Sequence, residues 1–201
     1  KEEIALMKKA VEITSAAFND LLSQIRPGMY EYEAEAILSS AFISRGATHA
    51  YAPIIASGKN NLVLHYNQND CQCKKGELLL LDFGAEYANY AADLSRTIPI
   101  SGNFTKKQKE VYSAVLSIMF QAKELMIPGN SINLVNEQVG TLMEKSLVEL
   151  KLLSINDIKR QDKENPAYRK FFMHGTSHFI GLDVHDRGEK DIVFENNMVL
   201  S

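Results

Sequence analysis

Two aspartates, Asp82 and Asp93, have the residue type and spacing that favour metal or acid–base chemistry. The apolar run Leu78–Leu81 leads into Asp82 and predicts a strand buried on both faces, and a second strand is expected from about Tyr90. If the connection is a two-residue turn at 87–88, the chain folds back antiparallel. The two aspartates then face each other across the ribbon.

Like charges in such a pair are destabilising, because directly opposed Cβ atoms lie about 4.5–5.5 Å apart. One solution is that a carboxylate keeps its proton, with a raised pKa. The other is that divalent metal ions are held between the two carboxylates and support metal-assisted chemistry. The alternative without chemistry is that Asp82 ends the strand while Asp93 faces solvent.

A histidine cluster near the end of the sequence adds a second type of ligand. Three of the five histidines, His174, His178 and His185, lie within a short stretch that is rich in phenylalanine and aliphatic residues. The glycines Gly175 and Gly181 oppose a helix there and favour a tight loop that leads into a strand. A single histidine on an apolar element is usually a satisfied polar group, but several buried imidazoles need specific partners. Mixed carboxylate and imidazole ligation suits Mn²⁺, Co²⁺, Fe²⁺ or Zn²⁺ better than Ca²⁺ or Mg²⁺.

Composition limits the class of protein. The 201 residues are 45% hydrophobic and 23% charged, which predicts one substantial core and one domain. A formal net charge of −3 gives no electrostatic reason to expect a nucleic acid or a membrane surface as partner. The apolar runs are far shorter than the ~20 residues of a membrane span, and the first residues lack the shape of a signal peptide, so we expect a cytoplasmic protein. The pair Cys71 and Cys73 is expected as reduced thiols rather than a metal site.

Apolar periodicity predicts two pairs of helices, each interrupted by Pro-Gly. Thr105 with Gln108 predicts a capping box for the third helix, and Ser131 a cap for the fourth. Because Pro27 and Pro128 occupy equivalent places, an internal duplication is the economical interpretation, and coincidence is the alternative. The four helices are predicted at about 4–25, 30–45, 106–126 and 132–153.

Between the helix pairs, the stretch 50–64 is predicted to be β-like. Its apolar runs Pro53–Ile55 and Leu62–Leu64 flank the loop Ser57–Asn61, and His65 follows directly.

A duplication also predicts an apolar strand at Met198–Ser201, after a polar insertion at Ser154–Arg169. The counterpart of Asp82 in the second half would then lie at, or a residue or two beyond, the first position after Ser201.

Four segments of the sequence are long and distinctive: RPGMYEYEAE, SGKNNLVLHYNQND, LLLLDFGAEYANYAADLSRTIPISG and MHGTSHFIGLDVHD. Together they resemble the catalytic domain of aminopeptidases P, the Xaa-Pro aminopeptidase branch of the pita-bread metallopeptidases, which also include prolidase, methionine aminopeptidase and creatinase. The resemblance implies an α+β pita-bread (creatinase/aminopeptidase-like) fold with two pseudo-symmetric helix-helix-sheet halves, the second incomplete. Residues 1–201 are then expected to be a partial catalytic domain that lacks an N-terminal domain and the final strands with two glutamate ligands.

The resemblance implies a site with two divalent metal ions, Mn²⁺ in the first place and Zn²⁺ or Co²⁺ as alternatives. Asp82, Asp93 and His178 are its implied ligands, with Asp93 bridging the two ions. The two further glutamates would lie beyond Ser201.

The resemblance also assigns roles around the metals. His65 and His185 flank the substrate and stabilise or protonate the tetrahedral intermediate. His174 lines the pocket for the proline of the substrate, and Tyr51 faces the same cleft.

The implied activity is hydrolysis of the N-terminal Xaa-Pro bond of peptides by a hydroxide that bridges the two metals, in a full-length protein expected to be a homo-oligomer, a dimer. The fragment alone is expected to be inactive. The alternatives are prolidase, which cleaves Xaa-Pro dipeptides, and an inactive pita-bread module that binds peptides or proteins. A mononuclear Fe²⁺ oxygenase that uses His178, His185 and one aspartate is a further, more distant alternative.

Overall fold

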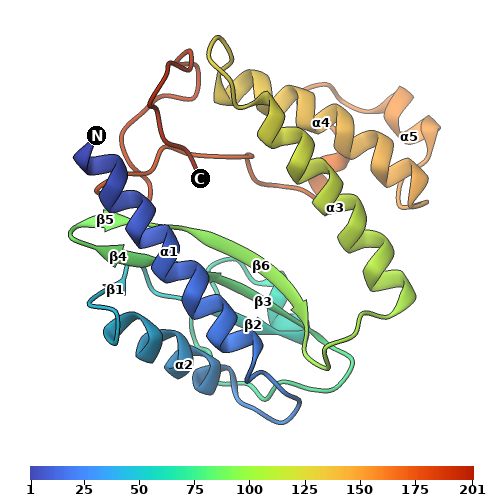
Figure 1. The fold of residues 1–201 in the computed structure, drawn as a ribbon. Helices are drawn as coiled ribbons and strands as arrows, with labels where there is room; N and C mark the ends of the chain where they lie inside the picture. Colours follow the sequence, from blue (N-terminus) through green and yellow to red (C-terminus); the bar gives the residue numbers. More distant parts are fainter. The chain divides into compact units, whose positions relative to one another are not determined.

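The two predicted helix pairs are present in the computed structural model, which describes residues 1–201 (Figure 1). The first pair is α1 (Glu2–Leu22) and α2 (Glu31–Ile43), and the second is α3 (Lys106–Leu125) and α4 (Ile132–Glu149). Ser131 accepts a hydrogen bond from the backbone N–H of Leu134, which confirms the predicted cap of α4. None of the helices combines the length and the apolar character that crossing a membrane requires.

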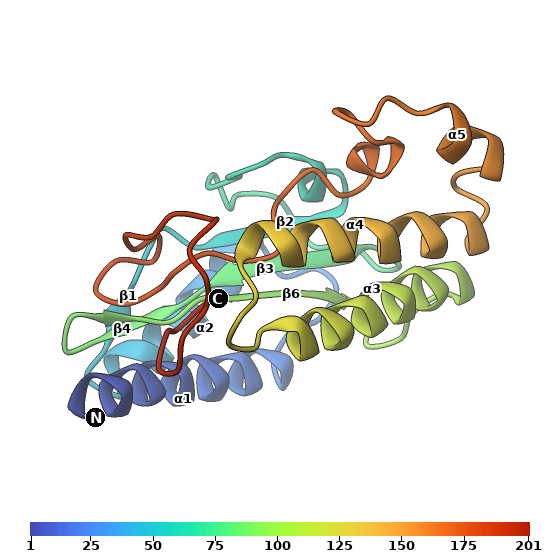
Figure 2. The same cartoon turned by 90° about the horizontal axis from the view of Figure 1, so that it is seen from above.

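The chain divides into two compact units, and each is described by itself. Unit 1 comprises Lys1–Thr105, Phe179–Asp186 and Ser201, and unit 2 comprises Lys106–His178 and Arg187–Leu200. In unit 2, α3 and α4 run side by side (Figure 2), and the polar insertion forms short helices after α4. In unit 1, α1 and α2 pack together against two small sheets (Figures 1 and 2).

All six strands belong to unit 1 and pair antiparallel. One sheet has the order β2-β3-β6 and the other the order β1-β4-β5. The strands are β1 (Thr48–His49), β2 (Ile54–Ser57), β3 (Leu78–Phe83), β4 (Ala85–Tyr87), β5 (Tyr90–Ala91) and β6 (Leu94–Pro99).

Strand β3 forms the core of unit 1 with one of its faces. Leu79, Leu81 and Phe83 are fully buried in a cluster with apolar residues of α1 and α2. The residues between them, Asp82 included, are only partly buried. The prediction of a strand buried on both faces was therefore wrong, because an antiparallel sheet packs one face on helices and leaves the other for polar groups.

The hairpin turn lies one residue later than predicted. Tyr87 pairs with Tyr90, and the residues between them, Ala88 and Asn89, have φ of 50° and 67°. Positive φ at both central residues is the requirement of a type I′ turn, whose twist matches that of the flanking strands. The sequence lacked the Asn-Gly signal because alanine occupies the first of these positions.

The new turn changes the register of the ribbon. Asp82 lies opposite Ser95, not opposite Asp93, so the predicted direct pair was wrong. The error amounts to two positions, and strand side chains alternate between faces with a period of two. Asp93 lies in the two-residue break between β5 and β6. Continuing the alternation from β6 through this break makes Asp93 a diagonal neighbour of Asp82 on the same face, and diagonal neighbours are still within reach of each other.

Gly84 allows the two chains of this ribbon to cross closely. A Cβ atom built at Gly84 would lie 1.7 Å from the backbone oxygen of Ala92, next to Asp93. Its own carbonyl accepts a hydrogen bond from the Ala50 N–H at 2.9 Å. Any side chain here would push apart the segments that carry the two aspartates.

Three predicted strands are not among those observed. The run Leu62–Leu64 begins at the last residue of the 3-10 helix η1 (Gly58–Leu62) and is exposed. It cannot pair with β3, because β2 and β6 already occupy both edges of that strand. The histidine-rich loop forms as predicted without a helix, but it does not lead into a named strand. Residues 198–201 form none either.

The internal duplication is supported by the two Pro-Gly turns. Gly28 and Gly129 have φ of 95° and 96°. The Gly28 N–H donates to the Cys73 carbonyl at 2.8 Å, and the Cys73 N–H donates back to the carbonyl of the residue after Gly28 at 2.7 Å. Unit 2 has the same pair of bonds: the Gly129 N–H donates to the Phe194 carbonyl at 3.0 Å, and the Phe194 N–H donates to the Asn130 carbonyl at 2.6 Å. The repeat thus extends from the helices to the distant segments that they hold.

The remaining histidine, His49, has a structural role in unit 1. Its Nε2 lies 2.7 Å from the Ser39 hydroxyl, its ring packs edge-on against Phe42, and its Nδ1 is buried without a hydrogen-bond partner. Burial lowers the pKa of His49 below 6.5, and the nearby Glu35 carboxylate only partly opposes this. The imidazole is therefore neutral in the folded protein.

We expect Gly84→Ala to destabilise the protein by about 3 kcal/mol, the upper part of the range for overpacked sites, because the added methyl group meets backbone. Denaturant unfolding measures the loss. Gly76→Ala is the control: its φ is 87° but no atom lies within 4 Å, so only the backbone strain of about 1 kcal/mol is expected. Equal losses in the two variants would contradict the close crossing.

We expect His49 to reduce stability in acid. The unfolded chain takes up the proton near pH 6.5 and the folded chain only at lower pH, so the free energy of unfolding falls as pH drops below about 6.5. The loss is about 1.4 kcal/mol for each unit by which the pKa is lowered. His49→Gln removes this contribution, and denaturant unfolding at pH 7, 6 and 5 measures it. An unchanged pH dependence in the variant would contradict the prediction.

Candidate functional site

The two aspartates converge on one hydroxyl group. The Tyr51 hydroxyl lies 2.7 Å from Asp82 Oδ1 and 2.8 Å from Asp93 Oδ1. Tyr51 precedes β2, which places its ring on the face of β3 opposite the apolar core. A hydroxyl has one proton, so it donates fully to only one carboxylate at a time. The prediction that the two acids share one face of the ribbon is confirmed, although the register behind it was wrong.

Burial and like charge both act against ionisation of Asp82 and Tyr51. Burial is the main cause that raises the pKa of Asp82, the Asp93 charge adds to it, and the Tyr51 hydrogen bond opposes it. The pKa of Tyr51 is raised by burial and by both carboxylates, so its hydroxyl stays protonated. A divalent cation beside the carboxylates would reverse this balance and favour their ionised forms.

A cavity of about 320 Å³ opens beside the two aspartates, entirely within unit 1. Five residues singled out from the sequence line this cavity: Tyr51, His65, Asp82, Asp93 and His185. They lie far apart in the sequence, so their order along the chain does not show that they meet. The lining residues are Tyr51, Ala52, Ile54, His65, Asn67, Asp82, Asp93, Val184 and His185.

His185 reaches the cavity on a tightly folded loop. The Gly181 carbonyl accepts the Ala91 N–H of β5 at 2.9 Å, and the Asp186 carboxylate accepts the Leu182 N–H at 3.1 Å. A Cβ atom on Gly181 would collide with Asp186 Oδ2 at 2.3 Å. A larger residue here would displace the Asp186 carboxylate from the turn, and the turn brings His185 to the site.

His174 and His178 belong to unit 2. His174 is exposed and His178 is partly buried. Between them, the N–H and the hydroxyl of Thr176 each lie 2.8 Å from the side-chain oxygen of Asn136 on α4, which fixes this part of the loop within unit 2. Their assignments as pocket residue and metal ligand stay predictions.

Sequence reasoning missed part of the cavity wall. Asn67 lies two residues after His65 in a segment without regular structure, so no periodicity pointed to it. Ala52, Ile54 and Val184 form apolar parts of the wall. Single apolar residues of this kind carry no pattern that distinguishes them from core residues.

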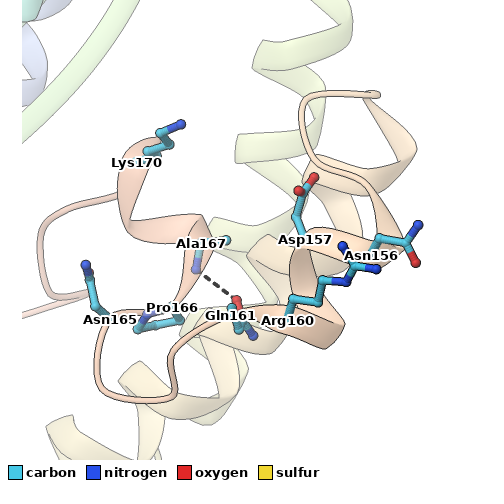
Figure 3. Close-up of a pocket in the computed structure, with 8 residues that line it drawn as sticks. All are labelled: Asn156, Asp157, Arg160, Gln161, Asn165, Pro166, Ala167 and Lys170. Atoms are coloured by element: carbon cyan, nitrogen blue, oxygen red, sulfur yellow. Dashed lines mark hydrogen bonds between the residues drawn. The ribbon is translucent and has the colours of Figure 1, made fainter.

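Two other features of the structure do not compete with this site. Glu31, Asp70 and Cys71 bring potential ligand atoms together, but the buried Glu31 already accepts hydrogen bonds from four donors. A hollow of about 420 Å³ in unit 2 (Figure 3) contains none of the predicted site residues. Figure 3 shows its one marked hydrogen bond, from the Ala167 N–H to Gln161.

The donor set fits a divalent transition metal. The Tyr51 hydroxyl offers one proton to the two carboxylates, so oxygen lone pairs remain free on both of them. Hard oxygen ligands of this kind suit divalent cations. The imidazoles of His65 and His185 line the same cavity. Oxygen donors with imidazole nearby suit Mn²⁺, Co²⁺ or Zn²⁺ better than Ca²⁺.

Comparisons with known proteins point in the same direction. The model of metallopeptidase family M24 matches residues 5–201. The Xaa-Pro aminopeptidase of Escherichia coli (strain K12) is 41% identical over 205 residues, which cover 100% of this chain and 46% of the relative. That of Haemophilus influenzae is 39% identical over 99% of this chain and 47% of its own length.

Solved structures agree with the sequence comparisons. A variant of Escherichia coli aminopeptidase P in complex with substrate matches with a TM-score of 0.93 and 40% identity, over 99% of this chain and 46% of that one. The zinc-substituted enzyme in complex with product matches equally well, with a TM-score of 0.93. The chain thus spans about half the length of the proteins that it resembles.

Proposed function

Because this chain belongs to metallopeptidase family M24, we propose that the protein hydrolyses the bond between an N-terminal residue and a following proline, and releases the N-terminal residue. The observation that carries the proposal is the convergence of Asp82 and Asp93 on the Tyr51 hydroxyl, in a cavity that His65 and His185 also line. Relatives named Xaa-Pro aminopeptidase support the choice of substrate. The proposal includes two sequence-based predictions, a homodimer and a cytoplasmic location.

Asp82, Asp93 and His178 are the residues proposed to hold two divalent ions. Mn²⁺ is the first choice, and a relative that was solved in zinc-substituted form supports Zn²⁺ as a second. Two such ions, when bound, act as Lewis acids and lower the pKa of water.

The histidines act on the substrate side of the cavity. His65 and His185 are exposed to it, so either can donate a hydrogen bond to the carbonyl oxygen as negative charge develops there. Ile54 and Val184 form an apolar part of the same wall. A prolyl peptide bond has no N–H, so the substrate must be recognised by the shape of its ring, a role proposed for His174.

The substrate assay distinguishes this proposal from the alternatives. We expect the full-length protein with Mn²⁺ to cleave Arg-Pro-Pro, and Asp93→Ala to reduce turnover by about 10³-fold or more because one ligand is lost. Cleavage of Xaa-Pro dipeptides but not of the tripeptide would identify a prolidase. A full-length protein that neither binds a transition metal nor turns over substrate would be a binding module.

We expect His185→Ala to lower kcat by about 10²–10³-fold while the bound metal, measured by elemental analysis, is unchanged. The reason is that the imidazole acts on the substrate and not on the metal. The control is His49→Gln, which removes a histidine that does not line the cavity and should leave kcat at neutral pH within about twofold. Loss of metal from His185→Ala would make this residue a ligand instead.

A further inference from the structure

Apolar packing does not hold the chain on the side that precedes His65. The preceding Leu62, Val63 and Leu64 are 86%, 55% and 56% exposed, and no helix or strand separates η1 from β3. His65 itself is exposed and has φ of 52°, a conformation that few residues other than glycine adopt. The following Tyr66 is buried, but its hydroxyl is itself hydrogen-bonded. Polar contacts are therefore a large part of what defines where this imidazole lies.

Most of these contacts meet on the carboxylate of Glu31, the first residue of α2. On the side before His65, Glu31 Oε1 accepts the Ser57 N–H at 2.6 Å and the Asn60 side-chain amide at 3.1 Å. On the side after it, Oε2 accepts the Tyr66 hydroxyl at 2.7 Å and the Cys71 N–H at 3.0 Å. One carboxylate thus joins both ends of the segment that carries His65.

Glu31 is fully buried, with an exposed fraction of 0%. A buried carboxylate is costly unless its oxygens are satisfied, and here four neutral donors satisfy them. Its place in the first turn of α2 also favours negative charge. Because each oxygen has two donors, replacing either oxygen by an amide NH₂ would leave two donors facing another donor.

Other hydrogen bonds also hold the segment that carries His65. Asn69 is 3% exposed, and it donates to Glu35 on α2 at 2.8 Å and accepts from the Ile55 N–H at 3.0 Å. Asn61 binds the backbone of β3 through the Leu80 N–H at 3.0 Å. The segment is therefore tied to α2, to β2 and to β3, the strand that also carries Asp82.

We propose that Glu31 is a positioning residue, whose buried carboxylate holds the segment 57–71 so that His65 faces the cavity beside Asp82 and Asp93. Glu31 itself does not line the cavity. The proposal rests on the proposed function, because the role of His65 is assigned there.

The test is a double-mutant cycle in the full-length, Mn²⁺-loaded protein with Arg-Pro-Pro as substrate. We expect Glu31→Gln to lower kcat about 10–100-fold with KM changed less than about threefold, because the misplaced imidazole affects the reaction more than binding. In a His65→Ala background, Glu31→Gln should lower kcat by less than about twofold further. An equal loss in both backgrounds, or no loss in either, overturns the proposal.

Two further variants keep the test decisive. Glu33→Gln changes a glutamate of the same helix turn that caps the Tyr30 N–H at 2.6 Å and does not contact the segment, so kcat should stay within about twofold. If Glu31→Gln does not fold, Tyr66→Phe replaces it, since it removes one donor and keeps the charge. We expect a fall of about 3–10-fold that is absent in the His65→Ala background, and an unchanged kcat overturns the proposal.

Hydrogen exchange supplies a readout that does not depend on activity. In Glu31→Gln, or in Tyr66→Phe if that variant is used, amides of 58–71 should exchange at least about tenfold faster, while those of β3 stay unchanged. If the wild-type protein has no peptidase activity, the proposed function fails, and the exchange data alone decide whether Glu31 holds the segment. If the wild-type protein is active but neither exchange nor kcat changes, only the positioning role fails.

Discussion

The structure depends on keeping two carboxylates together on one face of a ribbon whose other face is the core. Asp82 and Asp93 lie close enough to share the Tyr51 hydroxyl, which has one proton for two acceptors. Burial penalises their charge, and the pKa of Asp82 rises as a result. The adjacent Leu81 and Phe83 are fully buried in the apolar cluster. Strand alternation thus lets one segment provide both the stabilising core and the strained polar site.

The same alternation explains which part of the site could be predicted from the sequence. The predicted register of Asp82 and Asp93 was wrong by two positions, yet the conclusion that they share a face holds because the period of a strand is two. An error of one position would have placed them on opposite faces. The turn itself was unpredictable from local preference, since Ala88 adopts a positive φ that alanine normally avoids. Helices are less sensitive, and all four long ones were predicted from periodicity.

The remaining errors concern segments whose structure is set by distant partners. Leu62–Leu64 has the composition of a strand, but both edges of β3 are already paired, so the run remains exposed. Cys73 and Phe194 occupy equivalent places in the repeat because each bonds a Pro-Gly turn, although neither their types nor their spacing reveal it. Local patterns record which face a residue prefers; they do not record which hydrogen-bond partner arrives from elsewhere in the chain.

Glu31 shows why such a partner is needed near a reaction site. A catalytic imidazole must remain open to the substrate, so His65 cannot be fixed by burying the imidazole itself, and of its two neighbours only Tyr66 is buried. Hydrogen bonds can fix it from a distance, provided that their acceptor is itself held rigidly. Helix α2 meets this condition, because Ala34, Leu38 and Phe42 are fully buried in the core. Apolar burial thus holds α2 rigidly, and the Glu31 carboxylate at the start of this helix holds the segment that carries His65.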